Sequence, residues 1–184
     1  MDLFRVFDWD RTSLGPSEGG PLFVARDRQG AGRHDSPGHY GAWYCSRVAL
    51  SAVAESIKSL RGNALADRDF VRPGGVVKAL VRLRLDDEAD VVDLDDPPQL
   101  TARNIRPSQV ATTRRSVTQR IAQSIFRERA AGLSWWSTLD ADWTNVTLFH
   151  ERALPHIVVA ATPRVLSTRL PEVQAAAEHL GITF

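Results

Sequence analysis

The clearest periodic pattern in this chain is an alternation of apolar and charged residues near its middle. Val76–Leu85 ends in Leu-Val-Arg-Leu-Arg-Leu, and this two-residue period predicts a β-strand with one buried face. Shorter apolar runs are typical of further strands. These runs are Leu3–Phe7 with Arg5 at its centre, Pro21–Ala25, Gly41–Ser46, Gly132–Leu139, Asn145–Phe149 and His156–Ala161.

Three other stretches carry a helical period. One helix is predicted after Gly41–Ser46, with Ser46 as a candidate N-cap, and a second over Arg114–Ala130. Their apolar faces consist of Leu50, Val53, Ile57 and Leu60 in the first helix, and of Val117, Ile121 and Ile125 in the second. The last helix begins at Pro171 and is ended by Gly181.

The segment Asp86–Asp96 is strongly acidic. It carries seven acids but lacks the glycine and the final glutamate of an EF-hand calcium loop. A solvated hairpin that contains a short strand at Val91–Leu94 is the better prediction, and Pro97 and Pro98 end it.

Composition narrows the class of protein without naming a function. A chain of 184 residues, 43% hydrophobic and 24% charged, is most simply one globular domain spanning residues 1–184. A net charge of +1 gives no sign of nucleic acid or membrane as a partner. The lone Cys45 excludes internal disulfides, and neither a spanning segment nor a signal peptide is evident, so we expect a cytoplasmic protein.

Candidate chemistry is concentrated between Gly32 and Glu55. Arg33 lies in a loop rich in glycine and arginine, Tyr44 in the following strand and Glu55 in the helix after it, each eleven residues from the last. A cation, an aromatic ring and a carboxylate suit an anionic substrate with a flat ring and a bond that leaves positive charge when it breaks. The residues also allow plainer readings: a surface Arg33, a core Tyr44, and a Glu55 that faces solvent because it lies opposite the apolar stripe.

Several common motifs are missing from the sequence. The five histidines show no metal-ligand spacing, and no metal site is predicted. There is no Walker loop, no GxSxG elbow and no dinucleotide GxGxxG after a strand. The arginines of Arg114–Ala130 lack interleaved aromatics, so we expect a solvated face or a partner surface rather than direct nucleic-acid binding.

The order of these motifs resembles the RES domain, the toxin half of RES–Xre toxin–antitoxin pairs. The resemblance rests on Leu3-Phe4-Arg5-Val6, Gly32-Arg33, Trp43-Tyr44-Cys45-Ser46, Ala52-Val53-Ala54-Glu55, Asp93-Leu94 and the segment Gly132–Ser137. It covers roughly residues 3 to 160 in the right order. Two positions depart from the family pattern: His34 stands where an aromatic is common, and Trp135 replaces the usual tyrosine.

The resemblance implies an α+β fold similar to ADP-ribosyltransferases, with a split, twisted, mostly antiparallel sheet flanked by helices. It implies an NAD⁺ phosphorylase or glycohydrolase that depletes cellular NAD⁺, with NAD⁺ as substrate and no metal. Glu55 is then expected to stabilise the oxocarbenium-like transition state. Arg33 is expected to bind the pyrophosphate with help from Arg5, Tyr44 to stack on nicotinamide, and Ser137 to hold the ribose or amide.

The resemblance also sets the partners and the rival functions. Inorganic phosphate or water is the expected acceptor, and an Xre-type antitoxin the expected protein partner, in a homodimer or a larger hetero-oligomer. One rival function is mono-ADP-ribosylation of a cellular protein, and the other is a non-catalytic member that only binds a partner.

Overall fold

The structure, a computed structural model, describes residues 1–184 and has the predicted α+β architecture. The chain forms two compact units that interleave along the sequence. The first unit contains Met1, Val24–Tyr44 and Leu85–Ile157, and the second contains Asp2–Phe23, Cys45–Arg84 and Val158–Phe184. Each unit is described by itself below.

In the first unit the strand order is β4 (Val91–Asp93), β5 (Gly132–Trp136), β6 (Thr144–Phe149) and β2 (Ala42–Ser46). β5 and β6 are antiparallel, with Leu133 opposite Thr147. β4 runs parallel to β5, so the acidic segment is not the hairpin that we predicted. The amide of Leu94 donates to the carbonyl of Ser134, which draws this strand to β5 instead of back on itself.

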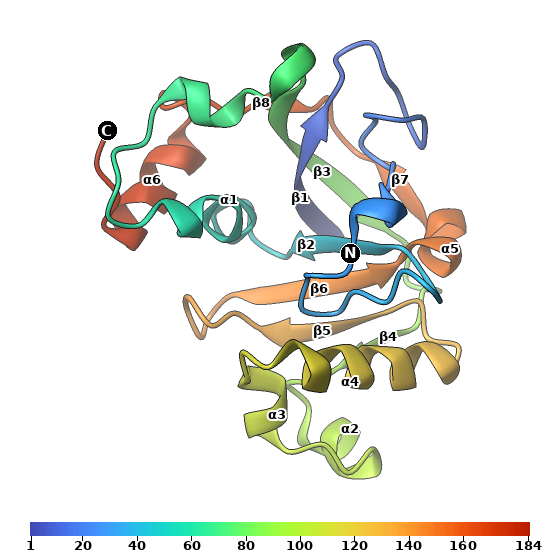
Figure 1. The fold of residues 1–184 in the computed structure, drawn as a ribbon. Coiled ribbons are helices and arrows are strands. Elements are labelled where there is room, and N and C mark those ends of the chain that lie inside the picture. The colour runs from blue at the N-terminus through green and yellow to red at the C-terminus, as the bar shows by residue number, and fades with distance from the viewer. The chain divides into compact units, whose positions relative to one another are not determined.

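The helices of the first unit follow β4 in the chain (Figure 1). They are α2 (Pro97–Ala102), α3 (Pro107–Ala111), α4 (Arg115–Arg127) and, after β6, α5 (His150–Ala153). Pro97, which we expected to end the acidic segment, is the first residue of α2. Proline is tolerated there because the amides of the first helical turn have no partner within the helix. α4 packs against β5 and buries Val117, Ile121 and Ile125, as the sequence predicts.

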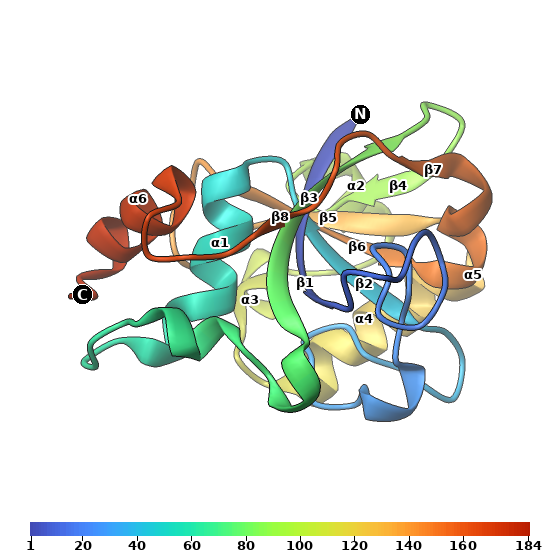
Figure 2. The same ribbon diagram turned by 90° about the horizontal axis from the view of Figure 1, so that it is seen from above.

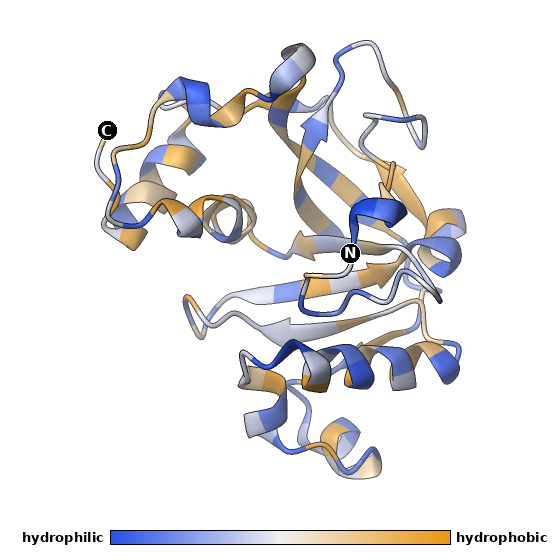
Figure 3. Ribbon diagram, viewed as in Figure 1, coloured by the Kyte–Doolittle hydropathy of each residue, from blue (hydrophilic) through white to orange (hydrophobic).

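In the second unit β1 (Asp2–Trp9) pairs along its full length with β3 (Val77–Leu85), antiparallel, from Asp2 opposite Arg84 to Trp9 opposite Val77. The alternation predicted for β3 is visible along the strand in Figure 3. β8 (Arg164–Val165) also pairs with β3, which is followed in the strand order by β7 (Ile157–Val159).

The helices of the second unit are α1 (Ala49–Ile57) and α6 (Pro171–Leu180), which lie side by side (Figure 2). Short 3₁₀ turns at Lys58–Leu60, Asp67–Phe70 and Pro73–Gly75 connect α1 to β3, and Arg26–Arg28 and Leu154–His156 form two more in the first unit. Gly181 ends α6 in the left-handed conformation, at φ 68°, as the sequence predicts.

Two further local predictions were wrong. Ser46 does not cap α1, because it is the fully buried last residue of β2, opposite Phe4, and the N-cap position belongs to Val48. Pro21–Ala25 is not a strand. The amides of Leu22 and Phe23 donate to the carbonyls of Gly15 and Gly20, and the carbonyls of Pro21 and Phe23 accept from Arg5, so these four groups are not available to a sheet ladder.

Candidate active site

The loop before β2, residues 29–41, holds Arg33 in a half-buried position and is called the arginine loop below. Nη1 of Arg33 donates to the carbonyl oxygen of Thr112 at 2.6 Å, just before α4. The hydroxyl of Thr118 in α4 donates to the carbonyl of Arg33 itself. Gln119, one residue on, donates to the carbonyls of Gly30 and Gly32 at 3.0 and 2.9 Å. The helix therefore holds the loop on both sides of the arginine.

A buried carboxylate holds the same loop from within. Asp35 is 6% exposed, and its Oδ2 accepts from the amides of Gly30 and Gly32, both at 2.7 Å. Its Oδ1 accepts from the hydroxyl of Tyr44 at 2.6 Å. A Cβ at Gly32 would lie 2.5 Å from both Oδ1 of Asp35 and the Tyr44 hydroxyl, so only glycine fits between them.

Tyr44 is therefore tied to the arginine loop by its hydroxyl. The hydroxyl donates to Asp35 and accepts from the amide of His34 at 2.9 Å. Burial, followed by the charge of Asp35 and the hydrogen bond to it, raises the pKa of Tyr44 above its usual value. The phenol stays neutral, and its ring lies in a stacked orientation 6.5 Å from the His34 ring.

The two departures from the family pattern touch each other. The rings of His34 and Trp135 meet edge to face, with centroids 4.5 Å apart at 89°. Nδ1 of His34 also lies 2.8 Å from the hydroxyl of Thr147, the residue opposite Leu133 in the β5–β6 ladder. Burial, then the charges of Arg33 and Arg115, lowers the pKa of His34 well below its ordinary value, so the ring is a neutral packing group.

Ser137 follows β5 and is 3% exposed. Its amide donates to the carbonyl of Trp143 at 2.7 Å, and its hydroxyl accepts from the amide of Leu139 at 3.1 Å. These bonds hold the turn between β5 and β6 in the first unit, which thus contains Arg33, Tyr44 and Ser137.

Glu55 and Arg5 belong to the second unit. Glu55 lies on α1, its side chain 27% exposed, and its carboxylate pairs with Lys58 at 2.6 Å. The apolar stripe of α1 alone suggested a Glu55 that faces solvent. The side chain is instead only partly exposed. Arg5 donates to the carbonyls of Pro21 and Phe23 at 2.5 and 2.9 Å, and burial lowers its pKa to about 10.

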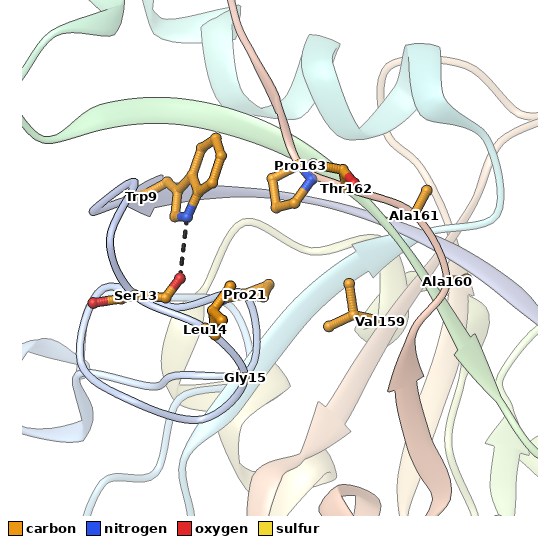
Figure 4. A pocket seen from close by; sticks show the side chains of 10 residues that line it. All are labelled: Trp9, Ser13, Leu14, Gly15, Pro21, Val159, Ala160, Ala161, Thr162 and Pro163. Carbon is orange, nitrogen blue, oxygen red and sulfur yellow. Dashed lines mark hydrogen bonds between the residues drawn. The ribbon is translucent and has the colours of Figure 1, made fainter.

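The second unit also contains a pocket of about 510 Å³ (Figure 4). Its wall is mainly apolar, with Trp9, Leu14, Val159 and Pro163 around it, and the Trp9 indole donates to the carbonyl of Ser13 at 3.3 Å. None of the predicted site residues lines it. No group of three or more histidine, cysteine, aspartate or glutamate side chains is placed to hold a metal ion.

The sequence analysis missed Asp35, Thr118 and Gln119. A signal for Asp35 existed, because Asp before Ser-Pro-Gly in a loop is typical of side-chain bonds to nearby amides. Thr118 and Gln119 gave no such signal in the sequence, since they reach the loop from α4 across about 85 positions of sequence.

None of the helices is both long and apolar enough to cross a bilayer.

The comparisons with known proteins agree with this architecture. The profile of the RES domain family matches residues 4–168. The crystal structure of the M. tuberculosis MbcT–MbcA toxin–antitoxin complex contains a chain of similar fold, with a TM-score of 0.64 and 16% identity over 98% of this chain and 87% of that one. No curated protein sequence matches. With nine-tenths of its length inside the family profile, the chain belongs to the RES domain family.

Proposed function

We infer that this protein is the toxin of a toxin–antitoxin pair and that residues 1–184 form a catalytic domain that cleaves the nicotinamide–ribose bond of NAD⁺. The observation that carries this inference is the loop of Arg33, held by Asp35, Tyr44 and α4, at the place where the RES profile covers the chain. A guanidinium held in this way can bind a diphosphate through paired hydrogen bonds.

The proposed reaction breaks one bond and forms one. The C–N bond to ribose breaks, and neutral nicotinamide leaves with the bonding electrons. The ribose then carries positive charge, which the carboxylate of Glu55 stabilises. Phosphate or water adds to the ribose carbon and releases a proton, giving ADP-ribose 1″-phosphate or ADP-ribose. Depletion of NAD⁺ in the cytoplasm is the toxic effect.

The other site residues bind and orient the substrate. The Tyr44 hydroxyl is engaged with Asp35 and His34, so its ring is the part that would stack on nicotinamide. Ser137 would hydrogen-bond the ribose or the amide, and Arg5 would assist at the pyrophosphate. An Xre-type antitoxin is the proposed partner, which agrees with a similar fold in a toxin–antitoxin complex.

The test is NAD⁺ consumption by the purified protein, with and without inorganic phosphate, beside Glu55→Gln. We expect consumption by the wild type and a loss of about 100-fold or more in kcat for Glu55→Gln, because the charge stabilisation is made only in the transition state. Acceleration by phosphate identifies a phosphorylase, and indifference to phosphate a hydrolase. The proposal fails if the wild type leaves NAD⁺ intact.

Transfer of ADP-ribose to a protein is the second candidate, favoured by the same binding loop. NAD⁺ labelled in the adenylate moiety separates the two. Label in free ADP-ribose or its phosphate supports depletion, whereas covalent label on a cellular protein supports transfer. If Glu55→Gln leaves any growth phenotype unchanged, a role limited to partner binding gains weight.

A further inference from the structure

The carboxylate of Asp35 collects three donors within the arginine loop. Two are the amides of Gly30 and Gly32, and the third is the hydroxyl of Tyr44. We propose that Asp35, acting with Tyr44, is a positioning residue that sets the place of Arg33 for the diphosphate of the substrate. This rests on the proposed function, in which Arg33 binds that diphosphate.

The backbone amides of the two residues next to Arg33 donate to this pair. The amide of Gly32 donates to Asp35, and the amide of His34 donates to the Tyr44 hydroxyl at 2.9 Å. The carbonyl of Arg33 is held in turn by Thr118. Since Gln119 holds the carbonyl of Gly32, the peptide groups on both sides of Arg33 are held. The start of the arginine side chain is therefore held too, and less conformational freedom is lost when its guanidinium binds a ligand.

Only a carboxylate satisfies the three donors at once. An ionised Asp is purely an acceptor, whereas an Asn offers one acceptor oxygen and an NH₂ group that donates. In Asp35→Asn the NH₂ group would face either the Tyr44 hydroxyl or the amides of Gly30 and Gly32, depending on how the amide is turned. At 6% exposure, water cannot readily replace the lost acceptor. The loop would therefore relax without a change in side-chain shape.

A stabilising role and a positioning role differ in their dependence on Arg33. If Asp35 only stabilises the fold, its loss changes ligand binding equally whether or not Arg33 is present. If it acts through Arg33, its effect on binding disappears when the guanidinium is removed, because neighbouring residues that share one function are not additive.

The experiment is calorimetric titration of ADP-ribose, a diphosphate that lacks the scissile bond, into wild type, Asp35→Asn, Arg33→Ala and the double variant. We expect Asp35→Asn to weaken the Kd about tenfold or more in the wild-type background. In the Arg33→Ala background its effect should stay within about twofold. Equal losses in both backgrounds, or no loss in either, overturn the proposal.

Two further variants sharpen the result. Tyr44→Phe removes the hydroxyl that joins Asp35 to the His34 amide, and Asp35→Asn should add little to it. Glu151→Gln is the control, because Glu151 also accepts from a backbone amide of this loop, that of Gly41, and pairs with Arg26. It should leave the Kd for ADP-ribose unchanged. A Kd weakened as much by Glu151→Gln as by Asp35→Asn would assign the effect to general loosening.

Turnover and hydrogen exchange separate this proposal from the function beneath it. With NAD⁺ as substrate, Asp35→Asn should raise KM while kcat changes little, since a diphosphate contact exists before and during the reaction. A wild type that neither binds ADP-ribose nor consumes NAD⁺ removes the proposed function. Faster amide exchange at Gly30, Gly32 and His34 in Asp35→Asn would then still show that Asp35 orders the loop, and unchanged exchange would refute that as well.

Discussion

At the scale of single residues, His34 shows how burial changes the meaning of a side chain. A histidine beside a loop arginine invites a role in proton transfer. Here its ring packs on Trp135 and contacts Thr147, and its pKa is lowered by burial and by Arg33 and Arg115. The residue therefore fills the place of an aromatic ring and adds one polar contact.

The lowered pKa of His34 predicts a pH dependence of stability. The unfolded chain takes up a proton near pH 6.5, where the folded chain does not, so the free energy of unfolding falls as pH drops below that value. The contribution is at most about 1.4 kcal/mol per pH unit. Urea unfolding can be measured from about pH 7 to about pH 5, a range that spans the ordinary histidine pKa. The free energy of unfolding should fall more steeply over this range for wild type than for His34→Phe. Parallel curves would contradict a neutral buried His34.

At the scale of elements, α4 does more than cover the sheet. Its buried stripe packs against β5, while Thr118 and Gln119 reach the carbonyls of the arginine loop. The stripe was predictable from periodicity, but the second contact depends on how the helix lies against the sheet. The outer face is hydrophilic, as Figure 3 shows.

Gln119→Ala tests this clamp. The two carbonyls of Gly30 and Gly32 would lose their amide donor, and we expect affinity for ADP-ribose to fall about two- to fivefold, less than for Asp35→Asn, because the loop is partly exposed there and water replaces the donor. Calorimetric titration of ADP-ribose measures this change in Kd. Gln123→Ala, one turn further along α4, is the matched control, and its Kd should equal that of wild type.

Close approach of two strands gives a second prediction at this scale. A Cβ at Gly132 in β5 would lie 2.5 Å from the carbonyl oxygen of Thr147 in β6, and backbone cannot move aside cheaply. Gly132→Ala should therefore lower the free energy of unfolding by roughly 1–3 kcal/mol. Chemical denaturation checks it, with Gly38→Ala as control, where nothing lies within 4 Å of the added carbon. Equal stability of both variants would refute the clash.

At the scale of the whole molecule, the chain passes between its two units within β2, from Tyr44 to Cys45. The hydroxyl of Tyr44 bonds to Asp35 in the arginine loop, and the thiol of Cys45 is buried, which raises its pKa to about 12. The family profile ends at Thr168, and α6 lies beyond it. Even so, α6 packs on α1, the helix that carries Glu55.

The buried face of α6 should therefore contribute to the stability of the second unit. Val173 is fully buried on that face, and Val173→Ala should cost roughly 1–3 kcal/mol of unfolding free energy. The exposed Glu178 on the opposite side provides Glu178→Ala as control. A thermal midpoint for Val173→Ala equal to that of the control would show that α6 is dispensable.

The sequence by itself determined the elements whose signals are local. The two-residue period of β3, the stripe of α4, and Pro171 with Gly181 around α6 were each read within a few residues, and the structure confirms them. The order of short motifs also indicated the RES family, which the profile match confirms. These helices and strands were predictable because secondary-structure propensity and hydrophobic periodicity are set by residues close together in the sequence.

Tertiary structure alone decided the features that join distant parts of the chain. Arg5 takes the carbonyls of Pro21 and Phe23 and so removes a strand that the local pattern favoured. β5 draws β4 into a parallel pair, and no local signal in an acidic segment predicts its partner. The three donors of Asp35 and the reach of α4 to the arginine loop arise only when the chain is folded, because hydrogen-bond partners are chosen by distance in space.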